Sequence, residues 1–221
     1  MKLLVYSAIT LAFIFITLFI LLNLLGVIDF EKIRQLILDT HQSSPQLLGI
    51  VIFIIIFSDL LIAVPTLTIS ILAGYLLGFQ MGFISVLSGM LLAGYTGYFI
   101  SRRYGNLILN RVANKLQIDE MHKLFQRHGL FMLLICRASP ILPEITACLS
   151  GMSRLSLSLF SLGWISNSLI YAAIATYAGS ISSLNNPMPA IYTAVAISGV
   201  LSLLWYLFIR KHRTLSKETS V

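Results

Sequence analysis

The residues whose chemistry stands out lie in one stretch, Cys136 to Glu144, where an arginine, a glutamate and two prolines interrupt an apolar run. A charged side chain at the centre of a bilayer costs about 2.5–3.5 kcal/mol on insertion scales, so it normally faces a partner or a water-filled cavity. Irregular backbone at membrane depth is likewise tolerated only where protein or water covers it. This stretch therefore predicts a transport site rather than a plain structural helix.

Arg137 is the strongest candidate for contacting a ligand. Beside the amino termini of half-helices, its guanidinium could bind a phosphate through paired hydrogen bonds and dipole attraction. A structural ion pair with Asp59 or Glu144 is the alternative, and a pair that opens for an anionic headgroup would serve both roles. The other members of the predicted substrate-binding set are prolines that would shape the helix tips: Pro65, Pro140 and Pro143.

Asp59 and Glu144 are acids embedded in apolar sequence. Burial favours the protonated form of a carboxyl group unless a cation such as Arg137 is adjacent. Either residue could therefore relay protons or gate a transport cycle; the alternative for each is structural pairing or helix capping. Glu144 follows Pro143 directly, where its charge would suit the amino terminus of a half-helix.

Patterns typical of enzymes and metal sites are missing from the sequence. The four histidines lack metal-ligand spacing, and no serine lies in a nucleophile-elbow pattern. Cys136 and Cys148 lie in apolar surroundings, which favours packed thiols over a disulfide or a metal pair. We therefore expect no catalytic residues, no metal and no cofactor.

The composition indicates a membrane protein. Of the 221 residues, 57% are hydrophobic and 10% are charged, and the mean hydropathy is +0.91. Several windows exceed the roughly 18 apolar residues that indicate a spanning helix. The net charge of +7 comes from basic residues in membrane-flanking loops, so it sets topology and needs no nucleic-acid partner.

Three regions organise the predicted chain. Residues 1–46 contain an anchor helix at 3–25 and a polar outer segment, and residues 179–221 contain a last span near 189–209 and a basic tail. The core, 47–178, comprises five segments: a hairpin at 47–79, a span at 81–100, a basic interfacial helix at 101–128, a hairpin at 129–151 and a span at 155–178.

The distribution of basic residues predicts that both hairpins are re-entrant. Residues 101–128 and the tail are rich in lysine and arginine, so both should be cytoplasmic. Two full spans between them already return the chain to the same side, so 129–151 must enter and leave from the cytoplasm. Its arms hold roughly 11 residues each, about 16 Å or half a bilayer. The same parity predicts that 47–79 dips in from outside, although its first arm, 47–64, is long enough to cross alone.

The two hairpins also resemble each other. Asp59 precedes Pro65 by six residues, and Arg137 precedes Pro143 by six. Paired interrupted segments of opposite topology are a sequence sign of a binding site at the membrane midplane. The predicted fold is therefore an all-α integral membrane protein: an inverted repeat of two re-entrant helical hairpins, each followed by a transmembrane helix, with further transmembrane helices at both ends.

Small residues at four-residue spacing predict close helix packing, with a sliding surface for conformational change as the alternative. They form two sets, each expected on one face of a helix: Gly74, Gly78 and Gly82, and Gly89, Ala93 and Gly97.

Residues 137–160, RASPILPEITACLSGMSRLSLSLF, resemble the DedA / SNARE-associated superfamily of VTT-domain membrane proteins. That family typically shows an arginine, a proline three residues later, a small residue followed by glycine, and a phenylalanine opening the next helix. The matching residues here are Arg137, Pro140, Ser150-Gly151 and Phe160. The first half is similar in a looser way, and the resemblance covers roughly 47–178.

Two departures bear on the substrate that the resemblance implies. Family members often carry a second arginine where this chain has Pro143, and a glutamate in the first hairpin where it has Asp59. The Pro-x-x-Pro pattern resembles the branch of the yeast Golgi Tvp proteins and the scramblase relatives. The family implies lipid translocation, and the missing arginine weakens an assignment to undecaprenyl phosphate.

The sequence thus predicts a flippase- or scramblase-like translocase for anionic, phosphate-bearing lipids, with proton coupling left open. The alternatives are a non-transporting membrane scaffold and a proton-coupled carrier of small anions. We expect a multi-pass protein of the bacterial inner membrane with a cytoplasmic carboxyl terminus, whose partners are membrane lipids. The sequence is silent on the oligomeric state and on the direction of transport.

Overall fold

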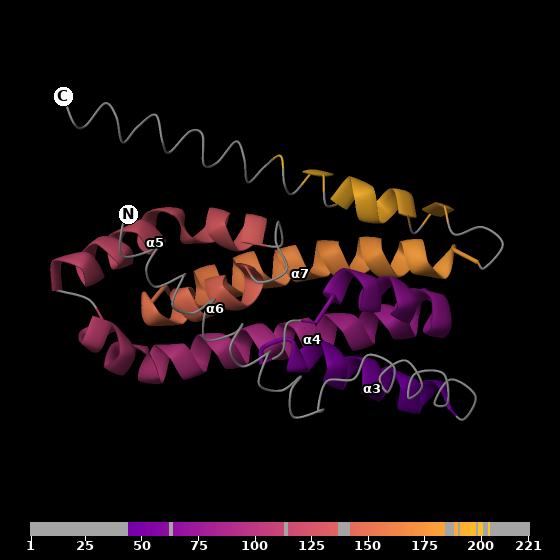
Figure 1. Ribbon diagram of the computed structural model, residues 1–221, viewed down its shortest axis with the longest axis horizontal. Helices are drawn as coiled ribbons and strands as arrows, with labels where there is room; N and C mark the ends of the chain where they lie inside the picture. The colour runs from indigo at the N-terminus through magenta and orange to yellow at the C-terminus, as the bar shows by residue number, and fades with distance from the viewer. Residues whose placement is uncertain are drawn as a thin grey trace.

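The computed structural model describes residues 44–61, 64–112, 115–136 and 142–183, together with 188–189, 191–197, 199–200 and 203 (Figure 1). Within these residues the chain is helical and contains no strand, which confirms the predicted all-α class. The anchor helix expected at 3–25, much of the span expected near 189–209 and the basic tail lie outside the described residues.

The first half of the described chain contains α3 (Pro45–Ser58) and α4 (Thr66–Val112), separated by a break. Pro45 occupies the first turn of α3, where its missing N–H leaves no hydrogen bond unmade. α4 reverses at Gly78, whose φ of 74° and ψ of 174° are not helical. Glycine reaches this conformation without a steric penalty. α4 therefore consists of a short arm, 66–77, and a long arm, 79–112.

The two arms of α4 lie side by side. A Cβ added at Gly82 would lie 2.7 Å from the carbonyl oxygen of Ala73 and 3.0 Å from the amide nitrogen of Gly74. The prediction that Gly74, Gly78 and Gly82 share one helix face is therefore wrong. Gly78 is the turn itself, so Gly74 and Gly82 lie on different arms and face each other across it.

The second half repeats this order of elements. α5 (Lys115–Ile135) ends at a break, and α6 (Leu142–Met152) is a short helix. The chain then reverses before α7 (Leu157–Ser180), and in this turn Arg154 has a φ of 52°. The Ser156 hydroxyl caps α7 by accepting a hydrogen bond of 3.4 Å from the N–H of Leu159.

The segment predicted as one basic helix, 101–128, is divided between two helices. The long arm of α4 continues to Val112, and α5 begins at Lys115 and runs on to Ile135, inside the expected second hairpin. No proline or glycine occurs between Gly105 and Gly129, so the sequence carries no breaker that would mark this division.

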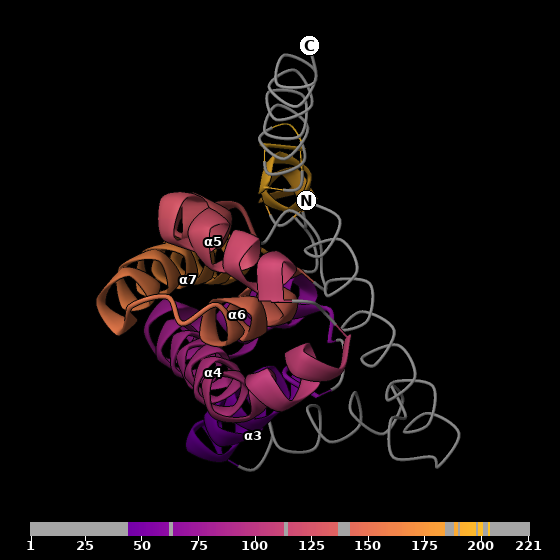
Figure 2. The ribbon, with the colours of Figure 1, turned by 90° about the vertical axis from the view of Figure 1, so that its left-hand side faces the viewer.

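The long arm of α4 and α7 form the centre of the molecule and run antiparallel. The indole Nε1 of Trp164 donates to the carbonyl oxygen of Met90 over 3.1 Å, and the Tyr95 hydroxyl donates to Ser161 over 2.7 Å. Residue numbers thus rise along one helix as they fall along the other. Figure 2 shows α3 beyond α4 on one side, and α5 beyond α6 and α7 on the other.

Each short helix packs against the long helix of the other half. Gly74 in the short arm of α4 lies so close to α7 that a Cβ there would overlap the carbonyl oxygen of Thr176. Gly151 in α6 approaches the carbonyl oxygen of Tyr98 in α4 in the same way. Glycine is needed at both positions because the backbones touch.

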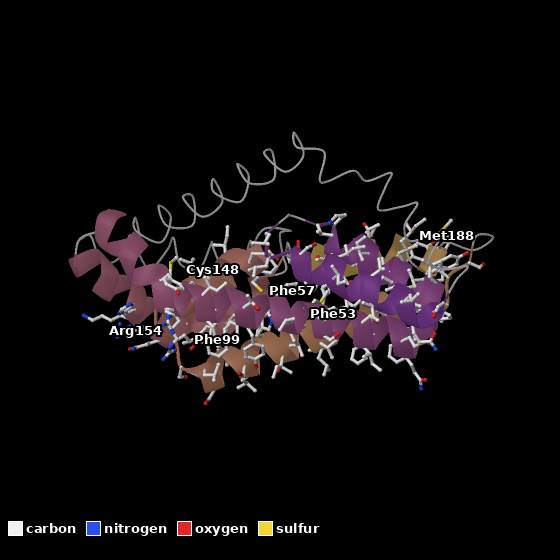
Figure 3. All side chains as sticks on the ribbon, turned by 90° about the horizontal axis from the view of Figure 1, so that it is seen from below. Phe53, Phe57, Phe99, Cys148, Arg154 and Met188 are labelled. Atoms are coloured by element: carbon white, nitrogen blue, oxygen red, sulfur yellow. The ribbon has the colours of Figure 1, made fainter. Side chains whose placement is uncertain are left out.

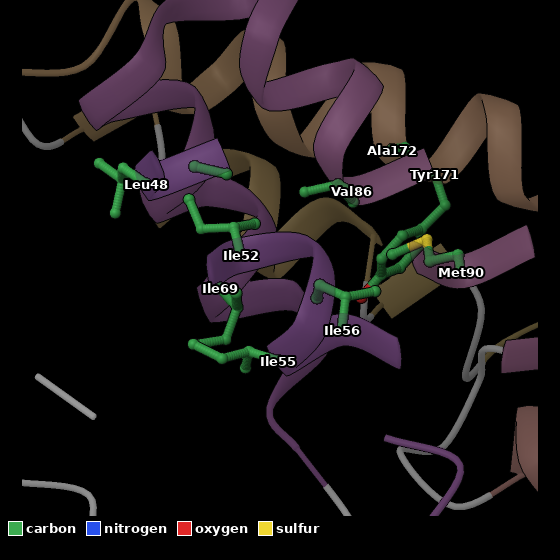
Figure 4. Packing of buried hydrophobic residues seen from close by; sticks show 10 residues of the cluster. Leu48, Ile52, Ile55, Ile56, Ile69, Val86, Met90, Tyr171 and Ala172 are labelled. Carbon is green, nitrogen blue, oxygen red and sulfur yellow. The ribbon is translucent and has the colours of Figure 1, made fainter. Parts of the chain in front are cut away.

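An apolar core joins α3, α4 and α7 (Figure 4). Leu48, Ile52 and Ile56 of α3 are at most 1% exposed and belong to one cluster with Val86 and Met90 of α4. Lipid tails are as apolar as these side chains, so in a membrane the contact is stabilised by van der Waals packing more than by exclusion of water. The fit of the side chains therefore matters more here than the apolar area alone.

Two helices in the described part of the chain are long and apolar enough to cross a membrane: Thr66–Gly105 and Leu157–Ser180. The first includes the turn at Gly78, so its crossing part is 79–105. That part is about 40 Å long at 1.5 Å per residue, against a hydrocarbon core of about 30 Å. Large apolar side chains on both helices are exposed, as expected of lipid-facing surfaces: Ile84, Leu92, Leu162 and Ile170.

Candidate functional site

The first break is closed by Asp59. This residue is 5% exposed, and its Oδ1 accepts a hydrogen bond of 2.8 Å from the N–H of Val64. Pro65 follows at the start of α4 and is exposed, and its carbonyl oxygen accepts the N–H of Ile69 over 3.1 Å. The carboxylate therefore spans the break and fixes how the chain enters the short arm, which is one of the structural roles expected for Asp59.

The second break is held at its start by Asn167, near the middle of α7. The Nδ2 of Asn167 donates to the carbonyl oxygen of Leu133 over 2.9 Å and to the Sγ of Cys136 over 3.2 Å. Asn167 is 8% exposed and Cys136 is 1% exposed, so the contact is buried. Arg137 and Pro140, which follow at once, lie outside the described residues.

The break ends in the first turn of α6. Pro143 is buried there, and Glu144 is half-buried and acidic at a helix amino terminus, as predicted for a capping role. Glu144 lies within electrostatic reach of the Cys148 thiol one turn later, and that thiol hydrogen-bonds to the Ser101 side chain of α4. α6 therefore brings the second predicted acid against the long arm of α4.

The first break and the helix that follows the second break, α6, approach each other at Gly97 in the long arm of α4. A Cβ added at Gly97 would lie 3.0 Å from Leu60 in the first break, 3.6 Å from the Sγ of Cys148 and 3.7 Å from Ala147. We call this set, Leu60, Gly97, Ala147 and Cys148, the junction. Leu60 neighbours Asp59, and Cys148 lies one turn from Glu144, so the structure brings the neighbourhoods of both acids to the same part of one spanning helix.

Sequence reasoning missed Asn167 and the full role of Arg102. An asparagine inside a predicted span is a signal in itself, because polar residues in transmembrane segments usually have a partner. Arg102 belongs to the basic segment 101–128 that was expected to set topology, and its Nη1 also donates to the carbonyl oxygen of Leu155 over 2.9 Å and to the Tyr98 hydroxyl. No local pattern could have revealed a partner so distant in sequence.

Both cysteines are free, Cys136 buried and Cys148 half-buried. Across the described ranges no group of three or more His, Cys, Asp and Glu side chains is placed to hold a metal ion.

Comparison with known protein families gives one match. The model of the VTT domain matches residues 64–181, which is more than half of the chain. The matched range contains both long helices and the second break, while α3 and Asp59 precede it. No curated protein and no solved structure matches the chain.

Proposed function

Because the chain belongs to the DedA/VTT-domain family of membrane, transporter-like proteins, we propose that it translocates anionic, phosphate-bearing lipids between the leaflets of a bilayer. In this proposal Arg137 binds the headgroup phosphate, and Asp59 and Glu144 gate the path or relay protons. Pro65, Pro140 and Pro143 shape the helix tips around the phosphate. The protein uses no catalytic residue and no cofactor.

The observation that carries the proposal is the junction. The first interruption of helical structure and the short helix that follows the second interruption, far apart in sequence, reach the same stretch of a spanning helix at Gly97. Each interruption has a predicted acid beside it: Asp59 is buried and Glu144 is half-buried. Irregular backbone and acidic side chains inside a membrane are retained where protein buries them or where they line a path for a polar or charged group, and the proposal rests on the second case.

The directions of the helices support an inverted repeat. α3 runs parallel to the long arm of α4, since Gly49 neighbours Ser85 and the later Ile56 neighbours Gly89. α5 is parallel to α7 in the same way, with Gly129 near Leu155 and Leu133 near Gly163. Because α4 and α7 are antiparallel, the two units point in opposite directions. The proposal takes each unit as a re-entrant hairpin that opens at its own membrane face.

The distribution of charge supports the topology in this proposal. The basic residues at the end of α4 and in the tail favour a cytoplasmic position for both segments in a bacterial inner membrane. The first hairpin then opens outward and the second opens to the cytoplasm. The protein crosses the membrane several times, and its carboxyl terminus is cytoplasmic.

The test is a lipid-translocation assay on the full-length protein in proteoliposomes. The assay measures the fluorescence of labelled phosphatidylglycerol that an impermeant quencher cannot reach. This protected fluorescence gives the fraction of the labelled lipid in the inner leaflet. Arg137→Ala should slow translocation about tenfold or more, because a charge-assisted hydrogen bond contributes about 1.5–3 kcal/mol. Arg213→Ala in the tail removes the same charge and should keep the wild-type rate.

The outcomes separate the proposal from its alternatives. Wild-type protein that moves no lipid would be a scaffold, and pH-dependent uptake of a small anion without lipid movement would indicate a carrier. An Arg137→Ala variant that translocates at the wild-type rate would remove Arg137 from the mechanism.

A further inference from the structure

Exposed basic side chains gather around the turn between α6 and α7. Among the residues whose side chains the structure describes, which leave out 106–121, every exposed charged side chain is basic, and all come from three neighbouring elements: Arg102, Arg103, Lys123, Arg127 and Arg154. Figure 3 shows nitrogen atoms concentrated at the end of the molecule that carries Arg154. We call these five residues the basic surface.

Specific contacts hold this surface together. The Leu155 carbonyl oxygen, directly after Arg154, accepts hydrogen bonds from Arg102 at 2.9 Å and from the Tyr98 hydroxyl at 2.6 Å. On the other side of the turn, the Nε2 of His122 lies 3.3 Å from the carbonyl oxygen of Met152. The part of α4 around Arg102 and the part of α5 around His122 are thereby held on either side of the turn that contains Arg154.

Arg154 occupies a backbone conformation that suits glycine better. Its φ of 52° makes it the one non-glycine residue with positive φ in the described part of the chain, and the corresponding turn in α4 is made by Gly78. A side chain with positive φ is strained, and such strain is found at sites where the side chain has a function. Arg154 is exposed, so the function available to it is contact with something outside the chain.

Apolar side chains border the basic surface directly. Tyr104, next to Arg103, is 53% exposed, and Leu157 and Leu159 in the first turn of α7 are 44% and 39% exposed. A soluble anion would bind to the basic side chains alone and would make no use of the apolar border. A phospholipid offers a phosphate for the cations and acyl chains for the apolar border, and tyrosine is enriched at this depth of a bilayer.

We propose that the basic surface binds the phosphate of an anionic phospholipid in the leaflet at which α4 ends, with Arg154 and Arg103 as contacts. This site lies beyond the junction along α4 and requires binding only, so it does not depend on translocation. Arg102 takes a positioning role, because its guanidinium is already bonded to the turn.

The experiment is native mass spectrometry of the purified full-length protein, titrated with phosphatidylglycerol or phosphatidylcholine. Wild-type protein should retain phosphatidylglycerol at lower lipid concentrations than phosphatidylcholine. Arg154→Gly suits the backbone of the turn and should fold normally; with Arg103→Gln it should weaken phosphatidylglycerol binding about fivefold for each charge removed. Arg154→Lys should keep the preference, and Arg213→Gln is the charge-matched control.

Equal binding of the two lipids by wild-type protein, or an unchanged preference in the double variant, would overturn the proposal. Displacement of phosphatidylglycerol by millimolar inorganic phosphate would also overturn it, by showing a site for free anions. A protein that binds phosphatidylglycerol here yet moves no lipid would leave this site intact and refute the proposed translocation alone.

Discussion

The amide of Asn167 holds α5 at the point where its helix ends. The last carbonyl groups of a helix lack intrahelical partners, and the Leu133 carbonyl oxygen accepts the Asn167 Nδ2 in this position. The Sγ of Cys136 accepts a hydrogen bond from the same Asn167 amide, and Cys136 directly precedes Arg137. Asn167 therefore determines where the chain carrying the predicted phosphate ligand leaves the helix.

Asn167→Leu should lower the free energy of unfolding by about 0.6–1.7 kcal/mol, the range measured for hydrogen bonds between helices in a membrane. It should also slow lipid translocation, because the backbone that carries Arg137 loses its anchor. Denaturant unfolding in micelles and the proteoliposome assay measure the two effects. Ser158→Leu, at an exposed position of α7, is the control. Wild-type stability and rate in Asn167→Leu would contradict this role.

The indole ring of Trp164 packs directly against the backbone of Gly94. A Cβ at Gly94 would overlap the indole ring, whose Nε1 donates to the Met90 carbonyl oxygen. Gly94→Ala should therefore lower the free energy of unfolding by about 1–3 kcal/mol through overpacking. At Gly199 nothing lies within 4 Å of an added Cβ, so Gly199→Ala should be neutral or slightly stabilising. Equal stability of the two variants in denaturant unfolding would refute this packing.

Charged residues in apolar sequence were predictable at this scale, but their partners were not. Asp59 and Glu144 stood out because embedded acids are rare, and the structure gives Asp59 a structural contact with Val64. The bond between Arg102 and Leu155 joins residues whose local sequences say nothing of each other.

Among the elements, the helices were predictable and the turns only in part. Proline and hydrophobic length indicated the breaks near Pro65 and Pro143, and α7 nearly coincides with the span expected at 155–178. The reversal near residue 80 was predicted, because the first hairpin was expected to end at 79 and the span to begin at 81, but Gly78 was not identified as its turn residue, because a glycine in an apolar helix equally indicates close packing. The division of the basic segment near Val112 has no sequence signal of its own.

The junction makes a prediction about distance between elements. Leu60 and Cys148 both lie beside Gly97, so Leu60→Cys should cross-link to Cys148 with a short bifunctional thiol reagent when Cys136 is replaced by alanine. Leu61→Cys is the matched control, because the Leu61 side chain is 54% exposed. The cross-link is measured by mass spectrometry after proteolysis. Efficient cross-linking from position 61 and none from position 60 would show that the first break lies elsewhere.

For the whole molecule, the similar order of elements in the two halves could be predicted from sequence, but the packing of one half on the other could not. The spacing of Asp59 and Pro65 against Arg137 and Pro143 indicated two similar hairpins. Each short helix packs on the long helix of the other half, and this packing depends on backbone contacts such as that of Gly74 with Thr176. Periodicity describes one element at a time, so it carries no information about these contacts.

The central claim is that the two hairpins open at opposite faces of the membrane. Cysteine labelling with an impermeant maleimide tests it most directly, in a chain with Cys136→Ala and Cys148→Ala. The ends of the first hairpin are probed by Gln46→Cys and Gln80→Cys, and those of the second by Gln126→Cys and Arg154→Cys, all at exposed positions.

In intact cells the first pair should react and the second pair should react only after the membrane is permeabilised. Labelling of Gln46→Cys and Gln80→Cys from different sides, or of all four positions from one side, would contradict the account.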